Sequence, residues 1–244
     1  MAVTEGRERR GGWLSLILAA VAGVAIGVAA MLFFGGGVSD ERLAQGVRDT
    51  IMANPEMLPE AMEELERKQA SAAVGPRKAQ FETPFAGAWA GAADGDVTLV
   101  TFFDYACGYC RQSNEALDRL LAEDPKLKVV WRELPVLGPG SEQAAYASLA
   151  AAEQGKFRPF YQALFAAGRP TPESISGAAA QAGVQSAAPS PAYRAELARN
   201  GQLATLIRAT GTPTFVVGDQ VLHGALPYED LKQAVADARE RKAG

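Results

Sequence analysis

A pair of cysteines at a predicted strand-to-helix junction is the feature that most constrains this chain. Residues 97–103 form a β-rich run, residues 110–122 repeat apolar side chains at helical spacing, and residues 128–134 form a second β-rich run. A strand, a helix and a strand at this spacing predict a βαβ unit with two parallel strands. Cys107 and Cys110 lie in the turn between the first strand and its helix.

The C-terminal half of the chain completes a mixed sheet. Residues 141 to about 209 contain helical stretches, and no strand is expected there. The predicted breaks lie at Gly155, at Gly168 to Pro172, with Thr171 as the cap of the next helix, and at Gly183 to Pro191. Residues 214–217 and 220–223 are β-rich runs on either side of a two-residue turn, which predicts a hairpin, and residues 228–241 form a closing helix. We therefore expect an α/β domain over residues 96–244, with a helical insertion between its βαβ and ββα halves.

The N-terminal residues differ from the rest of the chain. Three arginines precede an uninterrupted apolar run over residues 13–34. As a helix this run reaches about 33 Å, enough to cross a hydrocarbon core of ~30 Å. The arginines place residues 1–12 in the cytoplasm. The sequence thus predicts a single-pass membrane anchor, with the rest of the chain outside the cytoplasm. The alternative is a signal peptide cleaved after residues 27–29, which would leave a soluble exported protein.

Residues 38–70 are predicted to form two short amphipathic helices joined at Asn54-Pro55. Leu43, Val47 and Ile51 recur at four-residue steps in the first helix, and Leu58, Met62 and Leu65 share a face of the second. Two such helices cannot bury their apolar faces against each other, so we expect them to pack on the main domain or on other copies of the chain. A solvated spacer is the alternative. Residues 71–95 are rich in Ala and Gly and are expected to be a linker.

The composition excludes several classes of protein. The chain has 244 residues, with 24 basic and 28 acidic side chains, so we expect no nucleic-acid partner. Its two cysteines lie too close together to cross-link a fold. A zinc site usually needs four ligands, and the chain has two thiols and a single histidine, His223. We therefore expect no metal cofactor, although Cu(I) held by the two thiolates remains an open alternative.

The position of Cys107 and Cys110 suits redox chemistry. Unpaired backbone N–H groups and the helix dipole stabilise a thiolate at a helix start, which makes Cys107 the expected nucleophile. Cys110, one turn further on, can attack a mixed disulfide formed by Cys107. A redox-active Cys107–Cys110 disulfide is therefore expected in place of a cofactor. Gly108 and Tyr109, between the cysteines, are expected to contact substrate.

A proline at the start of a predicted strand supports the same interpretation. Pro213 opens the run 214–217, where proline normally fits badly. A cis Thr212–Pro213 bond beside the thiols would explain it. The backbone of Thr212 could then pair with an extended substrate segment. An ordinary trans proline that opens an edge strand is the alternative.

Together these motifs resemble the DsbA-like branch of the thioredoxin superfamily. The resemblance covers residues 96–241 and rests on four stretches: Phe-Phe-Asp-Tyr-Ala-Cys-Gly-Tyr-Cys, Leu-Gly-Pro-Gly-Ser-Glu, Gly-Thr-Pro-Thr-Phe-Val-Val-Gly-Asp and Leu-His-Gly-Ala. Within that branch the chain is most similar to the ScsC/Com1-type proteins (suppressor of copper sensitivity), whose N-terminal helical segment resembles residues 51–69.

The resemblance implies a thioredoxin fold with a helical insertion and a thiol–disulfide oxidoreductase of exported proteins. It also implies a single-pass protein of the bacterial inner membrane with its catalytic domain in the periplasm, or a soluble periplasmic protein if the signal is cleaved. It implies self-association through residues 38–70, as trimers in some relatives, and a membrane electron donor of the DsbD/ScsB type. Some relatives are isomerases and some are linked with copper tolerance.

Two departures from the family pattern bear on the activity. Strongly oxidising members carry a histidine between the cysteines, and this chain has Gly108-Tyr109, so we expect a disulfide isomerase or reductase, with a DsbA-like oxidase as the alternative. Many members also carry an acid where this chain has Thr101. Proton handling at Cys110 is therefore assigned to water or Asp104.

Overall fold

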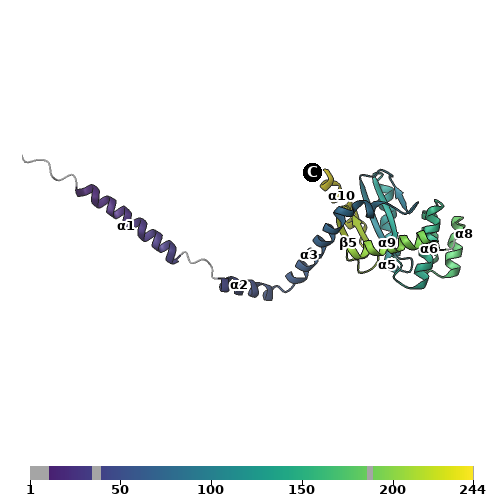
Figure 1. Ribbon diagram of the computed structural model, residues 1–244, viewed down its shortest axis with the longest axis horizontal. Helices are drawn as coiled ribbons and strands as arrows, with labels where there is room; N and C mark the ends of the chain where they lie inside the picture. The colour runs from purple at the N-terminus through teal and green to yellow at the C-terminus, as the bar shows by residue number, and fades with distance from the viewer. Residues whose placement is uncertain (1–10, 35–39, 186–188, 244) are drawn as a thin grey trace, which may run out of the picture. The chain divides into compact units, whose positions relative to one another are not determined.

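The computed structural model of the chain describes residues 11–34, 40–185 and 189–243 (Figure 1). The chain forms two compact units, residues 1–61 and residues 62–244, which are considered separately. Nearly all of the predicted cytoplasmic segment lies outside the described residues.

In the N-terminal unit, helix α1 (Gly11–Phe34) covers the apolar run. The predicted transmembrane span over residues 13–34 is nevertheless not supported. Among the described residues, no helix is both long enough and apolar enough to cross a membrane.

The two predicted amphipathic helices are present as α2 (Asp40–Ala53) and α3 (Met57–Val74). Their apolar side chains are largely exposed, and α2 has no buried residue. The exposed large apolar residues of the two helices are Leu43, Val47, Met52, Met57, Leu58, Met62 and Leu65. Such stripes of exposed apolar side chains are typical of surfaces that pack on a partner.

The second unit is built on a five-stranded mixed sheet with the order β1-β3-β2-β4-β5. Strands β2 and β3 are parallel, as the βαβ pattern predicted, and the other three pairs are antiparallel. The predicted hairpin is confirmed as β4 and β5. The strands are β1 (Trp89–Gly91), β2 (Val97–Phe103), β3 (Leu127–Glu133), β4 (Thr214–Val217) and β5 (Gln220–His223).

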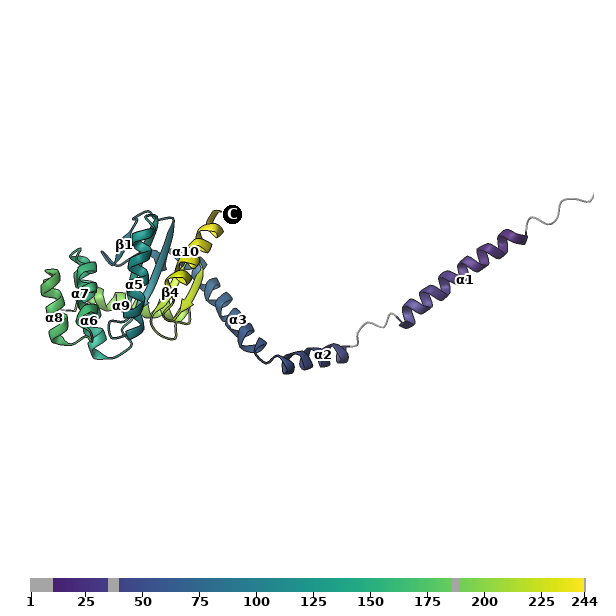
Figure 2. The same ribbon diagram turned by 180° about the vertical axis from the view of Figure 1, so that it is seen from behind.

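Helices cover both faces of this sheet (Figures 1 and 2). Alternate residues of a strand point to opposite faces. Leu99 and Val129 accordingly share a core with α5 (Gly108–Glu123) and α10 (Tyr228–Ala243). Val100 and Phe102 belong to a second core with α4 (Lys78–Glu82) and the end of α9 (Pro191–Leu206). All seven residues of β2 are buried, so the turn that follows β2 is held firmly by the sheet.

The predicted helical insertion consists of α6 (Pro139–Glu153), α7 (Phe157–Ala167), α8 (Pro172–Ala182) and α9. The helices of this insertion end at the positions that the sequence predicted. Gly155 and Gly183 adopt positive φ angles of 67° and 66°, a conformation that favours glycine. Thr171 caps α8, because its side chain accepts a hydrogen bond from the Ser174 N–H. Helices α6, α7 and α8 pack on one another at one end of the sheet (Figure 1).

The segment 71–95, predicted to be a linker, contains regular structure: the end of α3, a 3₁₀ turn (Gly75–Arg77), α4 and β1. Long-range contacts explain the difference. Phe81 is fully buried and its ring lies 6.3 Å from that of Phe102. Trp89 pairs with Val130 at the edge of the sheet. These partners lie far along the chain, so no local pattern signals them.

Arg132 fastens this segment to the sheet. It is 1% exposed and donates to the carbonyl oxygens of Gln80, Phe81 and Thr83 at 2.6–3.0 Å. It also donates to the side chains of Glu196 and Asn200 on α9 at 3.0 and 2.8 Å. Five acceptors thus depend on one buried guanidinium.

Replacing Arg132 with methionine is therefore expected to lower the free energy of unfolding by roughly 3–5 kcal/mol, because a buried carboxylate and several carbonyls lose their donor. Urea denaturation followed by circular dichroism measures the effect. The control is Arg119→Met, which removes an exposed ion pair with Glu123 and should change stability little. Equal effects of the two substitutions would contradict the account.

Candidate functional site

Cys107 lies at the start of a helix, as predicted. It is the N-cap residue of α5, with extended backbone angles, and its N–H donates to the Asp104 carbonyl at 3.0 Å. The side chain is 7% exposed. Unpaired N–H groups in the first turn of α5 and the helix dipole favour a negative charge on this sulfur.

The Thr212–Pro213 peptide bond is cis, as the sequence predicted. The Cys107 thiol donates a hydrogen bond to the Thr212 carbonyl oxygen, with 3.1 Å between Sγ and oxygen. Two motifs more than 100 residues apart in the sequence are thereby brought into contact.

Cys110 is more deeply buried than Cys107, with 2% of its surface exposed. Burial raises the pKa of the Cys110 thiol well above its ordinary value, and a negative charge on Cys107 acts in the same direction. The backbone of Asp104 and the side chain of Thr212 oppose this shift by hydrogen bonding. Cys110 therefore keeps its proton unless a base receives it.

Asp104 is a buried clamp beside the cysteines. One carboxylate oxygen accepts from the Ala106 N–H at 2.8 Å. The other accepts from the N–H groups of Val136 and Leu137 at 2.8 and 3.0 Å. Both oxygens are thus engaged, and the carboxylate holds the loop after β3 against the turn that carries Cys107. The geometry indicates a positioning role for Asp104, and the assignment of proton handling at Cys110 to water or Asp104 stays a prediction.

Three exposed apolar side chains surround this end of the domain, and we call them the apolar rim: Tyr109 (67% exposed), Val136 (56%) and Leu137 (51%). In the described part of the chain after α3, the only other exposed large apolar side chain is Leu206. Their concentration beside the thiols is typical of a binding surface. Gly108, by contrast, contributes no side chain.

A buried acid lies in the same core, and the sequence analysis missed it. Glu133, at the end of β3, is 2% exposed and its Oε1 accepts from the Ser148 hydroxyl at 2.8 Å. The Ser148 and Tyr105 hydroxyls are 2.8 Å apart. The second oxygen of Glu133, Oε2, is buried and has no hydrogen-bond partner among the described residues. We call Tyr105, Ser148 and Glu133 the buried acid cluster.

Burial raises the pKa of Glu133 to about 7. The signal that could have revealed this residue is its register. Glu133 pairs with Phe103 in the parallel ladder, four residues before Cys107. Strand alternation places its side chain on the same face as Val129 and Trp131, which share a core with both cysteines.

His223 and the two thiols are the residues that the sequence offered as metal ligands. His223 lies on β5, and its Nδ1 is 3.5 Å from the Thr214 hydroxyl. The described residues contain no group of three or more His, Cys, Asp or Glu side chains that could hold a metal. Cu(I) binding by the two thiols alone stays a prediction.

Comparison with known proteins decides the family. Residues 98–236, which include both cysteines and the cis proline, match the DsbA-like thioredoxin domain. The chain belongs to the DsbA-like thioredoxin family. Residues 42–72 also match the N-terminal domain of the copper resistance protein ScsC.

Several solved structures are similar to this chain over most of their own length. A ScsC variant from Proteus mirabilis is 26% identical, with a TM-score of 0.69, over 84% of this chain and 97% of that one. A thioredoxin-like oxidoreductase from Silicibacter pomeroyi is 36% identical (TM-score 0.63; 67% and 98% covered). A periplasmic thioredoxin-like protein from Salmonella enterica serovar Typhimurium is 28% identical (TM-score 0.64; 68% and 97% covered).

The curated relatives that this chain matches are much longer proteins. A Na⁺/H⁺ antiporter NhaA from Salinispora arenicola is 32% identical over 160 residues, which is 61% of this chain. The chain spans about a quarter of the length of the curated relatives it matches.

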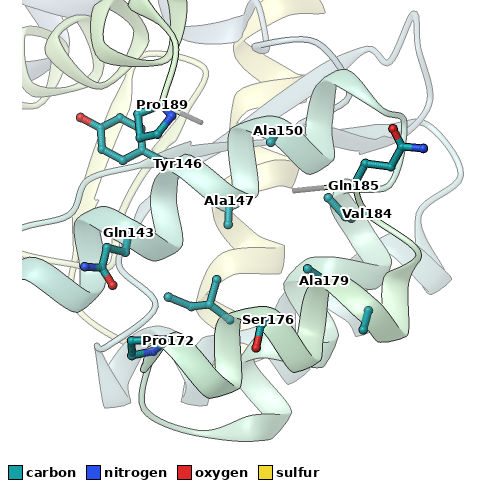
Figure 3. A pocket seen from close by; sticks show the side chains of 12 residues that line it. Gln143, Tyr146, Ala147, Ala150, Pro172, Ser176, Ala179, Val184, Gln185 and Pro189 are labelled. Atoms are coloured by element: carbon teal, nitrogen blue, oxygen red, sulfur yellow. The ribbon is translucent and has the colours of Figure 1, made fainter. Parts of the chain in front are cut away.

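The DsbA-like insertion also contains a cavity of about 490 Å³ between α6 and α8 (Figure 3). Its lining is mainly apolar and includes Tyr146, Ala147, Ile175, Ala179 and Val184. The residues that line it do not include either cysteine or the residues of the apolar rim.

The raised pKa of Glu133 predicts a pH-dependent stability. An unfolded chain releases this proton near the ordinary value of 4.5, whereas the folded chain releases it near 7. Stability from this group is therefore complete below about pH 4.5 and is lost as the pH rises through 7, a fall of roughly 3 kcal/mol.

Urea denaturation at pH 4.5 to 8 should show this fall in the free energy of unfolding in the native protein and not in Glu133→Gln. A matched variant at an exposed position, Glu115→Gln, should keep it. The account is wrong if Glu133→Gln retains the full pH dependence.

Proposed function

We propose that this DsbA-like chain is a thiol–disulfide oxidoreductase that isomerises or reduces disulfides of exported proteins. The observation that supports this best is the pairing of Cys107 at the start of α5 with the Thr212 carbonyl, while Cys110 lies buried one turn further on. The less buried sulfur, at the start of the helix, is proposed to attack the substrate, and the more deeply buried sulfur of Cys110 to resolve the product.

The proposed reaction begins when the Cys107 thiolate attacks a substrate disulfide. One substrate sulfur leaves as a thiolate and the other forms a mixed disulfide with Cys107. In isomerisation another substrate thiolate attacks this bond, a new substrate disulfide forms and Cys107 is released. In reduction Cys110 loses its proton and attacks the Cys107 sulfur. The substrate then leaves with two electrons more, and a Cys107–Cys110 disulfide remains.

The substrate is proposed to be a flexible polypeptide segment. The backbone of Thr212 lies beside the nucleophile and can pair with an extended chain by strand addition. Tyr109, Val136 and Leu137 of the apolar rim provide contacts for apolar side chains near the substrate disulfide. Unfolded or misfolded exported proteins expose such side chains together with their cysteines.

The residues between the cysteines favour the reducing direction. Neither Gly108 nor Tyr109 carries a positive charge that would stabilise the Cys107 thiolate. A less stable reduced form makes a dithiol less oxidising. The oxidised chain then requires a reductant, and we propose a membrane electron donor of the DsbD/ScsB type. A reduction potential near that of DsbA, ≈ −120 mV, would favour the oxidase alternative.

The proposed location is the periplasm. A similar solved structure is that of a periplasmic thioredoxin-like protein, and ScsC structures are similar over 84% of this chain. The N-terminal arginines followed by an apolar run are typical of exported proteins.

Trapping of substrates tests the proposed reaction. In cells, Cys110→Ala should accumulate mixed disulfides with exported proteins, since Cys107 can attack but nothing in the chain resolves the product. Non-reducing gels and mass spectrometry detect them. The matched variant Cys107→Ala should form none. If Cys110→Ala forms no more adducts than Cys107→Ala, the proposal fails, and tight Cu(I) binding with no activity on scrambled ribonuclease would favour the copper alternative.

Self-association is proposed through residues 38–70. The apolar side chains of α2 and α3 are exposed, and this region matches the ScsC N-terminal domain. Several active sites around one substrate would raise their effective concentration.

Replacing Leu43 and Val47 together with glutamine should therefore lower the oligomer mass of residues 38–244 in solution and reduce the refolding of scrambled ribonuclease. Asp49→Gln, on the same helix, is the control. Equal mass for all three proteins would contradict self-association through α2.

A further inference from the structure

The side chain of Asp104 connects two segments that meet at the reactive end of the domain. Asp104 is 2% exposed, and its Oδ1 accepts from the Ala106 N–H at 2.8 Å, in the turn after β2. Its Oδ2 accepts from the N–H groups of Val136 and Leu137 at 2.8 and 3.0 Å. Hydrogen bonds from backbone N–H groups to a carboxylate are stronger than those to a neutral acceptor. One buried side chain thus holds this turn against residues 135–138, which we call the rim loop.

The rim loop depends on this carboxylate for its position. Just before the loop, the Leu134 N–H donates to the Phe103 carbonyl at 2.7 Å, which joins the ends of β3 and β2. At its end, the Gly138 carbonyl accepts from N–H groups in the first turn of α6. Within the part of the chain that the structure describes, no hydrogen bond other than those to Asp104 ties the rim loop to another segment. Without them, this largely exposed loop would gain conformational freedom.

The rim loop carries two of the three side chains of the apolar rim. The N–H groups of Val136 and Leu137 donate to the buried carboxylate, whereas their side chains are exposed. The third side chain, that of Tyr109, is also exposed and lies two residues after Cys107, on α5. Asp104 therefore fixes the position of the loop half of the apolar rim relative to the Cys107 sulfur.

We propose that Asp104 sets the substrate selectivity of Cys107, so that disulfides flanked by an apolar side chain react faster than disulfides flanked by a polar one. The inference rests on the proposed function and leaves its chemistry unchanged: the Cys107 thiolate bonds to one substrate sulfur and the other leaves as a thiolate. An apolar neighbour of the substrate cysteine is removed from water against Val136 and Leu137 while this attack takes place. Asp104 does not touch the substrate, so it is a positioning residue.

Proton transfer between Asp104 and Cys110 would have a different kinetic signature. It would act after the mixed disulfide has formed, and it would change the rate of resolution for apolar and polar substrates alike. The selectivity of mixed-disulfide formation is a ratio of two rate constants measured on the same protein. A general effect of a substitution on the reactivity of the Cys107 sulfur cancels in this ratio, whereas a displaced rim loop changes it.

Two peptide disulfides that differ in one residue test the inference. Each is the symmetric disulfide of a short peptide with either leucine or glutamine next to its cysteine. The full chain with Cys110→Ala, in which the mixed disulfide accumulates, is the parent protein, and acid quenching with mass spectrometry gives the second-order rate constant of its formation. The parent should react about 10-fold faster with the leucine peptide than with the glutamine peptide. Adding Asp104→Ala should lower this ratio to about 2-fold or less.

Further variants show whether Asp104 acts through the rim loop. Val136→Ser together with Leu137→Ser should lower the ratio by a similar factor, and adding Asp104→Ala to this pair should lower it no further, because no apolar side chain remains on the loop to be positioned. Glu115→Gln, at an exposed position of α5, should keep the parent ratio. If Asp104→Ala does not fold, as judged by circular dichroism, Asp104→Asn replaces it. Its amide has one acceptor oxygen instead of two, so the ratio should again fall.

The outcomes separate this inference from the proposed function. A parent protein that forms no mixed disulfide at Cys107 with either peptide contradicts the proposed function. Mixed disulfides that form with both peptides, at a ratio that Asp104→Ala or Asp104→Asn leaves unchanged, overturn the selectivity role of Asp104 alone. A further fall of the ratio when Asp104→Ala is added to Val136→Ser and Leu137→Ser also overturns it, because Asp104 would then act by another route.

Discussion

The contact between the Cys107 thiol and the Thr212 carbonyl joins the two halves of this fold at its functional end. Cys107 is held there because β2 is buried along its whole length and because its N–H binds the Asp104 carbonyl immediately after that strand. Thr212 is held by the hairpin β4–β5, whose first strand pairs with β2. One central strand therefore positions both partners, although the helical insertion separates them in the sequence.

Two buried carboxylates near this site differ in their hydrogen bonding. Asp104 is saturated with backbone hydrogen bonds and keeps the loop that carries Val136 and Leu137 beside the thiols. Glu133 Oε2 has no hydrogen-bond partner among the described residues, and burial raises the pKa of Glu133 to about 7. The two thiols also differ in their surroundings, since Cys107 caps a helix while Cys110 is more deeply buried.

Local sequence patterns predicted most of the fold. The hairpin, the closing helix and the helical breaks at Gly155 and Gly183 are each encoded by a few neighbouring residues. Pro213 at a strand start predicted the cis bond for the same reason. Strand β1 and helix α4 were missed, because they depend on the burial of Phe81 and on distant Arg132. The predicted membrane span is not supported among the described residues.

Only the part of the candidate site that belongs to a sequence motif could be predicted. The spacing of Cys107 and Cys110 in the sequence already indicates redox chemistry. A single glutamate at the end of a strand gives no such indication. Glu133 became visible through its contact with Ser148 on α6, which requires the tertiary structure. The clamp formed by Asp104 likewise depends on a loop more than 30 residues away.

The account as a whole depends on unequal reactivity of the two sulfurs. Alkylation by iodoacetamide at pH 7 measures it most directly, with Cys110→Ser reporting on Cys107 and Cys107→Ser reporting on Cys110. Cys107 should react at least about 10-fold faster than Cys110, because only the thiolate reacts and burial raises the pKa of the Cys110 thiol. Equal rates, or a faster reaction at Cys110, would contradict the account.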